Sequence, residues 1–275
     1  MSVHRTTSPS EASMMDTQQL RETYMITDLI APAELRYRVT DLDRAIVGFA
    51  CPDNNQLELQ ADASMRASYF CERRELGILN IGESGIVTVD GKEYQLSNRE
   101  CLYIGRGAEE VIFKEDQGQK PQFYLVSYPA HTSYPTTKAS HADANRVDLG
   151  SGKTANERTI FQYIHEGGIK SCQLVMGYTE LAEGSVWNTM PAHTHDRRSE
   201  VYLYFDVPEG NMITHLMGEP EETRHLLVHD RQAVLSPPWS IHSGCGTSNY
   251  CFVWAMGGEN QTFDDMDGID VLDLM

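Results

Sequence analysis

Two short stretches of the chain decide the fold: PAHTHDRRSE at residues 191–200 and SPPWSIHSG at residues 236–244. Together they contain the side chains that carry the chemistry, His193, His195, Glu200 and His242. On a strand, side chains at positions i and i+2 point to the same face. The spacing of the first two histidines therefore predicts that both imidazoles reach the same point.

The glutamate and the distal histidine complete a metal-binding set. Glu200 follows a charged turn and opens the expected strand Val201–Asp206, and an antiparallel neighbour would carry its carboxylate back beside the imidazoles. Three imidazoles and one carboxylate suit Zn²⁺, Mn²⁺, Fe²⁺, Ni²⁺ or Co²⁺, with room left for water or a substrate oxygen. We expect one divalent metal per chain.

Around these stretches the chain is patterned as short strands. From about Arg36 onward, apolar runs of strand length alternate with turn residues at intervals near ten, and Asp90-Gly91 after Val89 predicts a two-residue hairpin. Such spacing favours a β-sandwich or barrel over alternating βαβ units. A helix is expected at Asp16–Met25, where Asp16 can cap the N-terminus. We therefore predict an all-β fold with few short helices.

Length and composition predict two domains. A chain of 275 residues holds one large or two ordinary domains, and the polar stretch Tyr134–Lys153 separates two strand-rich halves. We expect an N-terminal tail with a short helix at residues 1–28, a barrel without metal at residues 29–136, a connection at residues 137–153 and a metal-binding barrel at residues 154–275.

The charge balance excludes several classes of partner. Lys and Arg number 22 against 40 Asp and Glu, a formal net charge of −18, and such a surface repels phosphate backbones and anionic lipids. No apolar run reaches the length of a membrane span, the N-terminus lacks the apolar region of a signal peptide, and the six cysteines form no C-x-x-C pair. We expect a cytoplasmic protein without nucleic-acid or membrane partners.

The spacing of the four ligands resembles the metal motif of the cupin superfamily, so the two barrels would form a bicupin, with jelly-roll barrels. The surrounding segments are similar to the 5-keto-4-deoxyuronate isomerase family along nearly the whole chain, at residues 41–52, 69–82, 129–136, 187–205, 218–247 and 258–267. The first half has no H-x-H pair and is expected to be a degenerate cupin barrel. The ligand set carries over onto His193, His195, Glu200 and His242, and the family implies zinc as the metal.

This resemblance implies a metal-dependent aldose–ketose isomerase. Its substrate would be an anionic sugar, 5-dehydro-4-deoxy-D-glucuronate (4-deoxy-L-threo-5-hexosulose uronate), converted to 3-deoxy-D-glycero-2,5-hexodiulosonate in pectin and uronate catabolism. The enzyme would be a homo-oligomer, a hexamer among relatives. The carbonyl transfer can follow an enediolate with a general base or a hydride shift, and the sequence does not separate these routes. The alternatives are another metal-dependent cupin enzyme, such as a dioxygenase, and a non-catalytic sugar-binding cupin.

Further candidates lie near the ligands. The substrate-binding candidates are three arginines, which can hold a carboxylate through two N–H groups, and two tyrosines on the same strand face as Glu200: Arg197, Arg198, Arg224, Tyr202 and Tyr204. His225 is a candidate general base, on a strand whose inner face the sequence does not identify. The acidic segment Asp264–Asp267 is a candidate for closing the site or capping the barrel.

Overall fold

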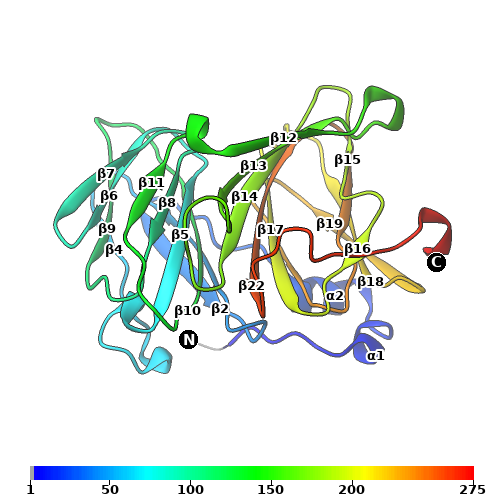
Figure 1. Ribbon diagram of the computed structural model, residues 1–275, viewed down its shortest axis with the longest axis horizontal. Coiled ribbons are helices and arrows are strands. Elements are labelled where there is room, and N and C mark those ends of the chain that lie inside the picture. Colours follow the sequence, from blue (N-terminus) through cyan, green and yellow to red (C-terminus); the bar gives the residue numbers. More distant parts are fainter. Residues whose placement is uncertain (1–2) are drawn as a thin grey trace. The chain divides into compact units, whose positions relative to one another are not determined.

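Strands dominate the structure, a computed structural model that describes residues 3–275 (Figure 1). By its internal contacts the chain divides into two units that interleave along the sequence. The first unit contains mainly Asp28–Ala144 and Tyr163–Val175; the second contains Arg5–Thr27, Asn145–Gln162 and Met176–Met275. The helices found are short, and the all-β class expected from the sequence is confirmed.

The first unit is built from two antiparallel sheets. Six strands follow the order β11-β8-β5-β10-β3-β2, and four follow the order β4-β9-β6-β7. Their bounds are β2 (Glu34–Val39), β3 (Ile46–Cys51), β4 (Leu57–Glu58), β5 (Arg74–Asn80), β6 (Gly85–Val89), β7 (Lys92–Leu96), β8 (Cys101–Ile104), β9 (Val111–Glu115), β10 (Phe123–Pro129) and β11 (Thr137–Ala139). Both sheets contribute to one apolar core that includes Leu76, Ile78, Val87, Leu102 and Phe113.

The hairpin predicted at Asp90-Gly91 joins β6 to β7. Val89 stands opposite Lys92, so the connection has two residues. Asp90 and Gly91 both have positive φ, 47° and 78°, as a type I′ turn requires. The prediction is confirmed, and the turn fixes the register of the two strands.

The second unit contains three sheets, with strand orders β1-β20-β17-β22-β14-β13-β12, β15-β21-β18-β19 and β16-β23. Their bounds are β1 (Met25–Ile26), β12 (Asn145–Leu149), β13 (Arg158–Ile164), β14 (Val175–Leu181), β15 (Trp187–Asn188), β16 (His193–Thr194), β17 (Arg198–Phe205), β18 (Ile213–Glu219), β19 (Glu222–Val228), β20 (Ala233–Ser236), β21 (Ser243–Gly246), β22 (Cys251–Gly258) and β23 (Asp267–Gly268).

The N-terminal segment belongs to this second unit. Helix α1 (Pro9–Ala12) precedes α2 (Thr17–Tyr24), and Asp16 caps α2 by accepting a hydrogen bond of 2.9 Å from the Gln19 backbone N–H. The helix buries Leu20 and Tyr24, and β1 directly after it pairs with β20. The expected helix is confirmed, and its apolar face attaches the segment to the unit that carries the four ligand candidates.

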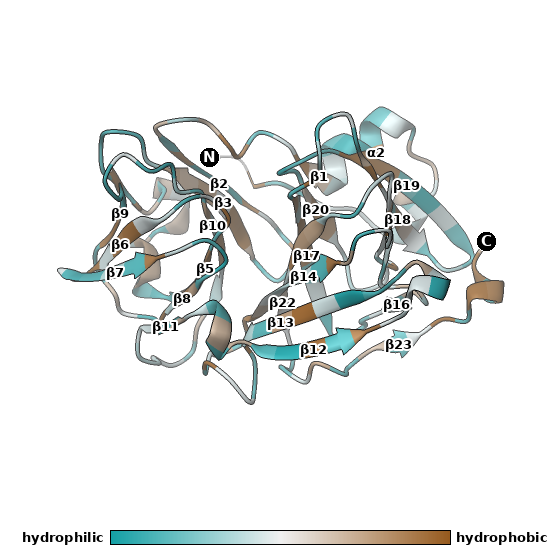
Figure 2. Ribbon diagram, turned by 90° about the horizontal axis from the view of Figure 1, so that it is seen from above, coloured by the Kyte–Doolittle hydropathy of each residue, from teal (hydrophilic) through white to brown (hydrophobic). Residues whose placement is uncertain are grey.

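The polar stretch expected as a connection contains strands. β11 pairs with β8, and β12 pairs with β13. β12 is largely hydrophilic, whereas β13 beside it carries a hydrophobic stretch (Figure 2). Because β12 is an edge strand with mostly exposed side chains, its sequence lacks the apolar alternation that marks a strand.

In the described part of the chain, five short 3₁₀ helices complete the elements, at Ala63–Met65, Phe70–Glu72, His141–Asp143, Gly152–Thr154 and Val271–Asp273. Within residues 3–275, no helix has both the length and the apolar character needed to cross a bilayer. The same part of the chain has no disulfide among its six cysteines.

Candidate metal centre

The four ligand candidates come from three segments of the second unit. His193 lies in β16 and His195 directly after it, Glu200 lies within β17, and His242 immediately precedes β21. The expected antiparallel pairing of the histidine strand with the glutamate strand is wrong, because β16 pairs with β23 instead. β17 also begins earlier than expected, at Arg198, so Glu200 lies inside the strand. Side chains alternate along a strand, and Glu200 therefore shares the cavity-facing side with Arg198 and Tyr202.

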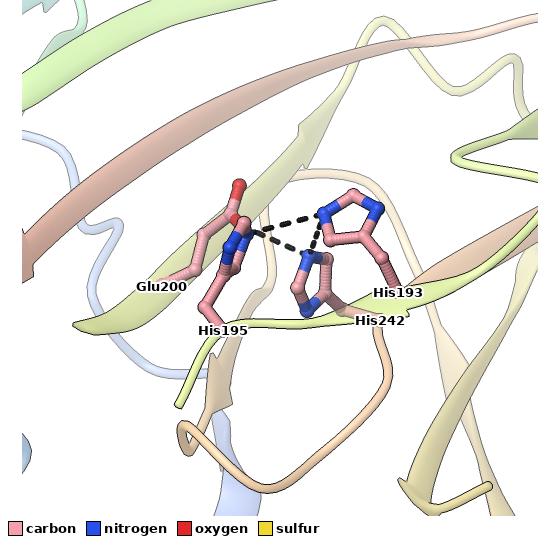
Figure 3. Close-up of side chains that lie close together, drawn as sticks. All are labelled: His193, His195, Glu200 and His242. Carbon is pink, nitrogen blue, oxygen red and sulfur yellow. Dashed lines mark hydrogen bonds and ion pairs between the residues drawn. The ribbon is translucent and has the colours of Figure 1, made fainter. Parts of the chain in front are cut away.

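The four side chains nevertheless meet (Figure 3). His193 Nε2 lies 3.1 Å from His195 Nε2 and 3.0 Å from His242 Nε2. Glu200 Oε2 lies 3.3 Å from His195 Nε2 and 3.1 Å from His242 Nε2, which closes a ring of four donor atoms. Two donors each about 2.1 Å from one ion are this far apart when they subtend about 90–105°. The donor set and its spacing therefore fit a divalent metal.

Burial favours the neutral form of two of these imidazoles, His193 and His242. His195, Glu200 and His242 are 3%, 4% and 1% exposed, and His193 is half-buried. Burial, together with the neighbouring His195, lowers the pKa of His193 to about 3. Burial also holds the pKa of His242 well below its usual value, again with help from the other two histidines. Neutral imidazoles keep the lone pairs that a cation needs.

Hydrogen bonds behind the ring orient two of the imidazoles. His195 Nδ1 donates to the backbone carbonyl of Asp265 over 2.5 Å, and His242 Nδ1 hydrogen-bonds Ser236 Oγ over 3.2 Å. In both rings the bonded nitrogen is the one that faces away from the cluster. These contacts fix ring orientation, as outer partners of metal-binding histidines do.

Two arginines fix the loop that carries Asp265. Arg198, 1% exposed, donates to the backbone carbonyls of Thr262, Phe263 and Asp265 over 2.6, 3.1 and 3.2 Å. Arg197 forms ion pairs with the carboxylates of Asp265 and Asp267, and its hydrogen bond lowers the pKa of Asp265 to about 2. The loop therefore presents its carbonyl to His195 from a firmly held position.

A cavity of about 220 Å³ opens beside the ring. Of the substrate-binding candidates, Arg198 and Tyr202 line it. The Tyr202 ring lies 5.5 Å from the His242 ring, and its hydroxyl is 3.2 Å from Thr189 Oγ1. The cavity has apolar walls from Phe252, Trp254, Met256, Phe263 and Met266. The acidic segment Asp264–Asp267 therefore closes part of the site through Met266, and Phe263 directly before the segment adds to the same wall.

The other candidates lie outside the cavity. β19 buries Leu226 and Val228, and His225, which shares the opposite face with Leu227, is exposed and does not line the cavity. Arg224 pairs with Glu222 over 2.6 Å and does not line the cavity. The Tyr204 hydroxyl lies 2.7 Å from His215 Nδ1, a buried pair beneath the site.

Sequence reasoning missed Arg158 and Thr189, which line the cavity, and the buried His215. Arg158 begins β13 and shares a face with Ile160, two residues along the strand. That alternation is present in the sequence, but it does not tell which face is the inner one.

Comparison with known proteins places the whole chain. Residues 29–270 match the KduI/IolB family. The 4-deoxy-L-threo-5-hexosulose-uronate ketol-isomerase of Lachnoclostridium phytofermentans is 50% identical over 275 residues, which is 100% of both chains. The enzyme of the same name from Formosa agariphila is 51% identical over 268 residues, covering 97% of this chain and 96% of the relative.

Solved structures agree on the fold. An IolB-like protein from Salmonella typhimurium LT2 aligns with a TM-score of 0.70 at 13% identity, covering 87% of this chain and 94% of that one. An oxalate decarboxylase from Lactobacillus farciminis aligns with a TM-score of 0.60 at 10% identity, covering 90% and 88%. The bicupin fold expected from the sequence is therefore confirmed.

Proposed function

The chain belongs to the KduI/IolB family, and from this membership we propose that it is a metal-dependent ketol-isomerase acting on 4-deoxy-L-threo-5-hexosulose uronate. The observation that carries the proposal is about 50% identity along the entire chain to enzymes of that name. The product would be 3-deoxy-D-glycero-2,5-hexodiulosonate. The buried ring of three imidazoles and one carboxylate can hold a metal ion, and it opens to a cavity that can hold a substrate.

We propose His193, His195, Glu200 and His242 as the ligands of one zinc ion. Histidine and carboxylate side chains are common zinc ligands, and a neutral imidazole has the nitrogen lone pair that binds the ion. When bound, a divalent ion would supply Lewis-acid polarisation of the substrate carbonyl and stabilise negative charge that develops on its oxygen.

The surrounding side chains would bind and orient the substrate. Tyr202, on the cavity wall beside His242, offers a hydroxyl to a substrate oxygen. The apolar side chains of Phe252, Trp254 and Met256 exclude water, which strengthens every electrostatic interaction inside. In the reaction the C1 aldehyde becomes a hydroxymethyl group while the C2 hydroxyl becomes a ketone, so no redox cofactor is consumed.

The test is direct conversion. Purified, metal-loaded protein is incubated with the 4-deoxy-5-keto uronate released by pectate lyase, and the 2,5-diketo product is followed by NMR. We expect stoichiometric conversion without O₂ uptake. No conversion by metal-loaded protein would contradict the isomerase and favour a binding cupin, whereas oxygen consumption would favour a dioxygenase. Running the reaction in D₂O separates the routes, because an enediolate admits solvent deuterium at C1 and a hydride shift does not.

We also propose that the enzyme acts in the cytoplasm, in pectin and uronate catabolism, as a homo-oligomer. The exposed apolar side chains Leu272 and Met275, 91% and 77% exposed at the C-terminal end, support self-association, since burying them removes apolar surface from water. Light scattering of the purified chain measures its mass in solution. A monomer at micromolar concentration would contradict this part of the proposal.

A further inference from the structure

Two arginines line the cavity beside the ring without a direct ion pair in the described part of the chain. Arg158 and Arg198 both line it, and within the described chain neither comes within ion-pair distance of an Asp or Glu. Burying a guanidinium without a counter-charge is costly, and such groups in proteins are normally paired. Glu200 and Asp265 offset part of the charge of Arg198 without a direct ion pair, whereas Arg158 interacts electrostatically with two tyrosines. A guanidinium at the cavity without a paired carboxylate, that of Arg158, indicates that the ligand of the cavity is an anion.

The two arginines differ in what they have left to offer. Both terminal nitrogens of Arg198 are engaged by loop carbonyls, and only its Nε lacks a partner among the described residues. Arg158 makes one hydrogen bond, from Nη1 to the Asn156 carbonyl at 2.9 Å. Its remaining N–H groups keep the fork that binds a carboxylate through two parallel bonds.

Arg158 also lies at the right place in the sheet. The strands run in the order β17, β22, β14, β13, so two strands separate the one carrying Glu200 from the one carrying Arg158. Strands about 4.8 Å apart put these two backbones about 14 Å from each other, and both side chains reach inward and shorten that gap. The guanidinium lies close enough to the Tyr202 and Tyr250 hydroxyls to interact with them electrostatically. Tyr202 thus lies near both Arg158 and the ring.

We infer that Arg158 binds the C6 carboxylate of the substrate, at the end of the cavity opposite the ring of His193, His195, Glu200 and His242. This rests on the proposed function for the identity of the substrate. The ring end would hold the C1 and C2 oxygens, and the arginine end would hold the acid. Arg198, fixed in the wall, adds positive potential. The pair would select acyclic uronates over neutral sugars of the same length.

The experiment compares Arg158→Gln, Arg158→Lys and a control, Arg146→Gln. Arg146 lies on the neighbouring β12, is exposed and pairs with Asp148, so its loss removes the same charge outside the cavity. Steady-state kinetics give kcat and KM for the uronate. Calorimetry on metal-free protein gives the Kd for the same uronate without turnover. Both are repeated with the analogue that carries a C6 alcohol in place of the acid.

We expect Arg158→Gln to raise KM and Kd for the uronate by about 10- to 100-fold, the loss of a charge-assisted bidentate pair, with a smaller change in kcat. Arg158→Lys should recover part of the loss, and the control should match wild type. The C6 alcohol should bind wild type and Arg158→Gln equally weakly.

Unchanged KM and Kd in Arg158→Gln would overturn the inference, and so would an equal loss for acid and alcohol, which would indicate a purely structural role. Failure of wild type to convert the uronate would instead count against the proposed function, and the Kd of the metal-free protein would still test Arg158.

Discussion

At the scale of single residues, the ring depends on imidazoles that stay neutral and turn Nε2 inward. Burial supplies the first condition for His193 and His242, and hydrogen bonds at Nδ1 supply the second for His195 and His242. Neither condition is set by the ligands alone. The residues behind them should therefore affect metal affinity without touching the metal.

Arg198→Met tests this dependence. The change removes the three hydrogen bonds that hold the loop at Thr262–Asp265, and so loosens the carbonyl that orients His195. We expect zinc affinity to fall roughly 10- to 100-fold, as for other outer partners of metal ligands. Competition with a chromophoric chelator measures it. Arg231→Met, at an exposed ion pair with Asp230, is the control, and equal affinities in both variants would contradict the role of the loop.

His242→Ala removes a proposed ligand directly. It leaves three donors of the ring, and we expect a loss of zinc affinity beyond the roughly 100-fold that outer partners cost, with loss of isomerase activity. Elemental analysis after dialysis gives the metal content, and circular dichroism confirms that the chain is folded. Full metal content in a folded variant would show that the residue is not a ligand.

His215 makes a pH prediction. Burial lowers its pKa from 6.5 to about 3, so between these values the unfolded chain binds a proton that the folded chain does not. This difference in proton binding lowers the free energy of unfolding as the pH falls from 6.5 toward 3. The loss is absent above pH 6.5 and reaches about 2–3 kcal/mol at pH 4.5. Between pH 7 and pH 4.5, the free energy of unfolding of His215→Gln should therefore fall by about 2–3 kcal/mol less than that of wild type. Urea denaturation at both pH values measures the two changes. Parallel losses would refute the prediction.

At the scale of elements, the sequence predicted those features that depend only on residues close together in the chain. The α2 cap at Asp16 and the I′ turn at Asp90-Gly91 depend on neighbours in sequence, and both are confirmed. The ligand set was proposed from residue type and spacing, and the structure brings its members together. The hydrophilic strand β12 was not predicted, because an edge strand with exposed side chains needs no alternation of apolar and polar residues.

What the sequence could not predict depends on contacts between distant segments. The pairing of β16 with β23 joins residues about seventy apart, and with the Arg198 hydrogen bonds it places the Asp265 carbonyl against His195. The outward position of His225 follows from which face of β19 packs on the interior, which alternation alone leaves open. Arg158 was missed for the same reason.

A buried carboxylate fixes an element of the first unit. Glu75, at the start of β5, accepts hydrogen bonds from the Tyr103 hydroxyl at 2.8 Å and from the backbone N–H groups of Cys172, Gln173 and Leu174 at 2.6, 2.9 and 2.9 Å. Glu75→Gln turns an acceptor into a donor that faces these donors. We expect about 2–4 kcal/mol of lost unfolding free energy, by urea denaturation, because buried N–H groups lose their acceptors.

The control for this change is Glu93→Gln, which alters an exposed side chain on β7 and should be nearly neutral. Zinc affinity should be unchanged in both variants, since the ring lies wholly in the second unit. Equal stability of the two variants would show that Glu75 does not hold the segment.

At the scale of the whole molecule, net charge and site charge have opposite signs. The chain carries −18 overall, yet the cavity is lined by Arg158 and Arg198 beside the carboxylate of Glu200, and neither arginine forms a direct ion pair in the described residues. The acidic surface therefore describes the solvated exterior, and a carboxylate substrate meets positive charge only where water is excluded. A bound divalent ion at the ring would add to that local reversal.

Metal binding should also distinguish the two units in stability. Because the ring joins β16, β17 and the segment before β21, an ion that binds only the folded second unit stabilises it by mass action, by about 4 kcal/mol at a free concentration of 1,000 Kd. Chelation should therefore lower Tm and speed hydrogen exchange in β17 and β22, while exchange in β5 and β10 of the first unit stays slow. In His242→Ala the chelator should change neither quantity. A uniform gain in exchange over both units, or the same chelator effect in that variant, would mean that the ion acts elsewhere.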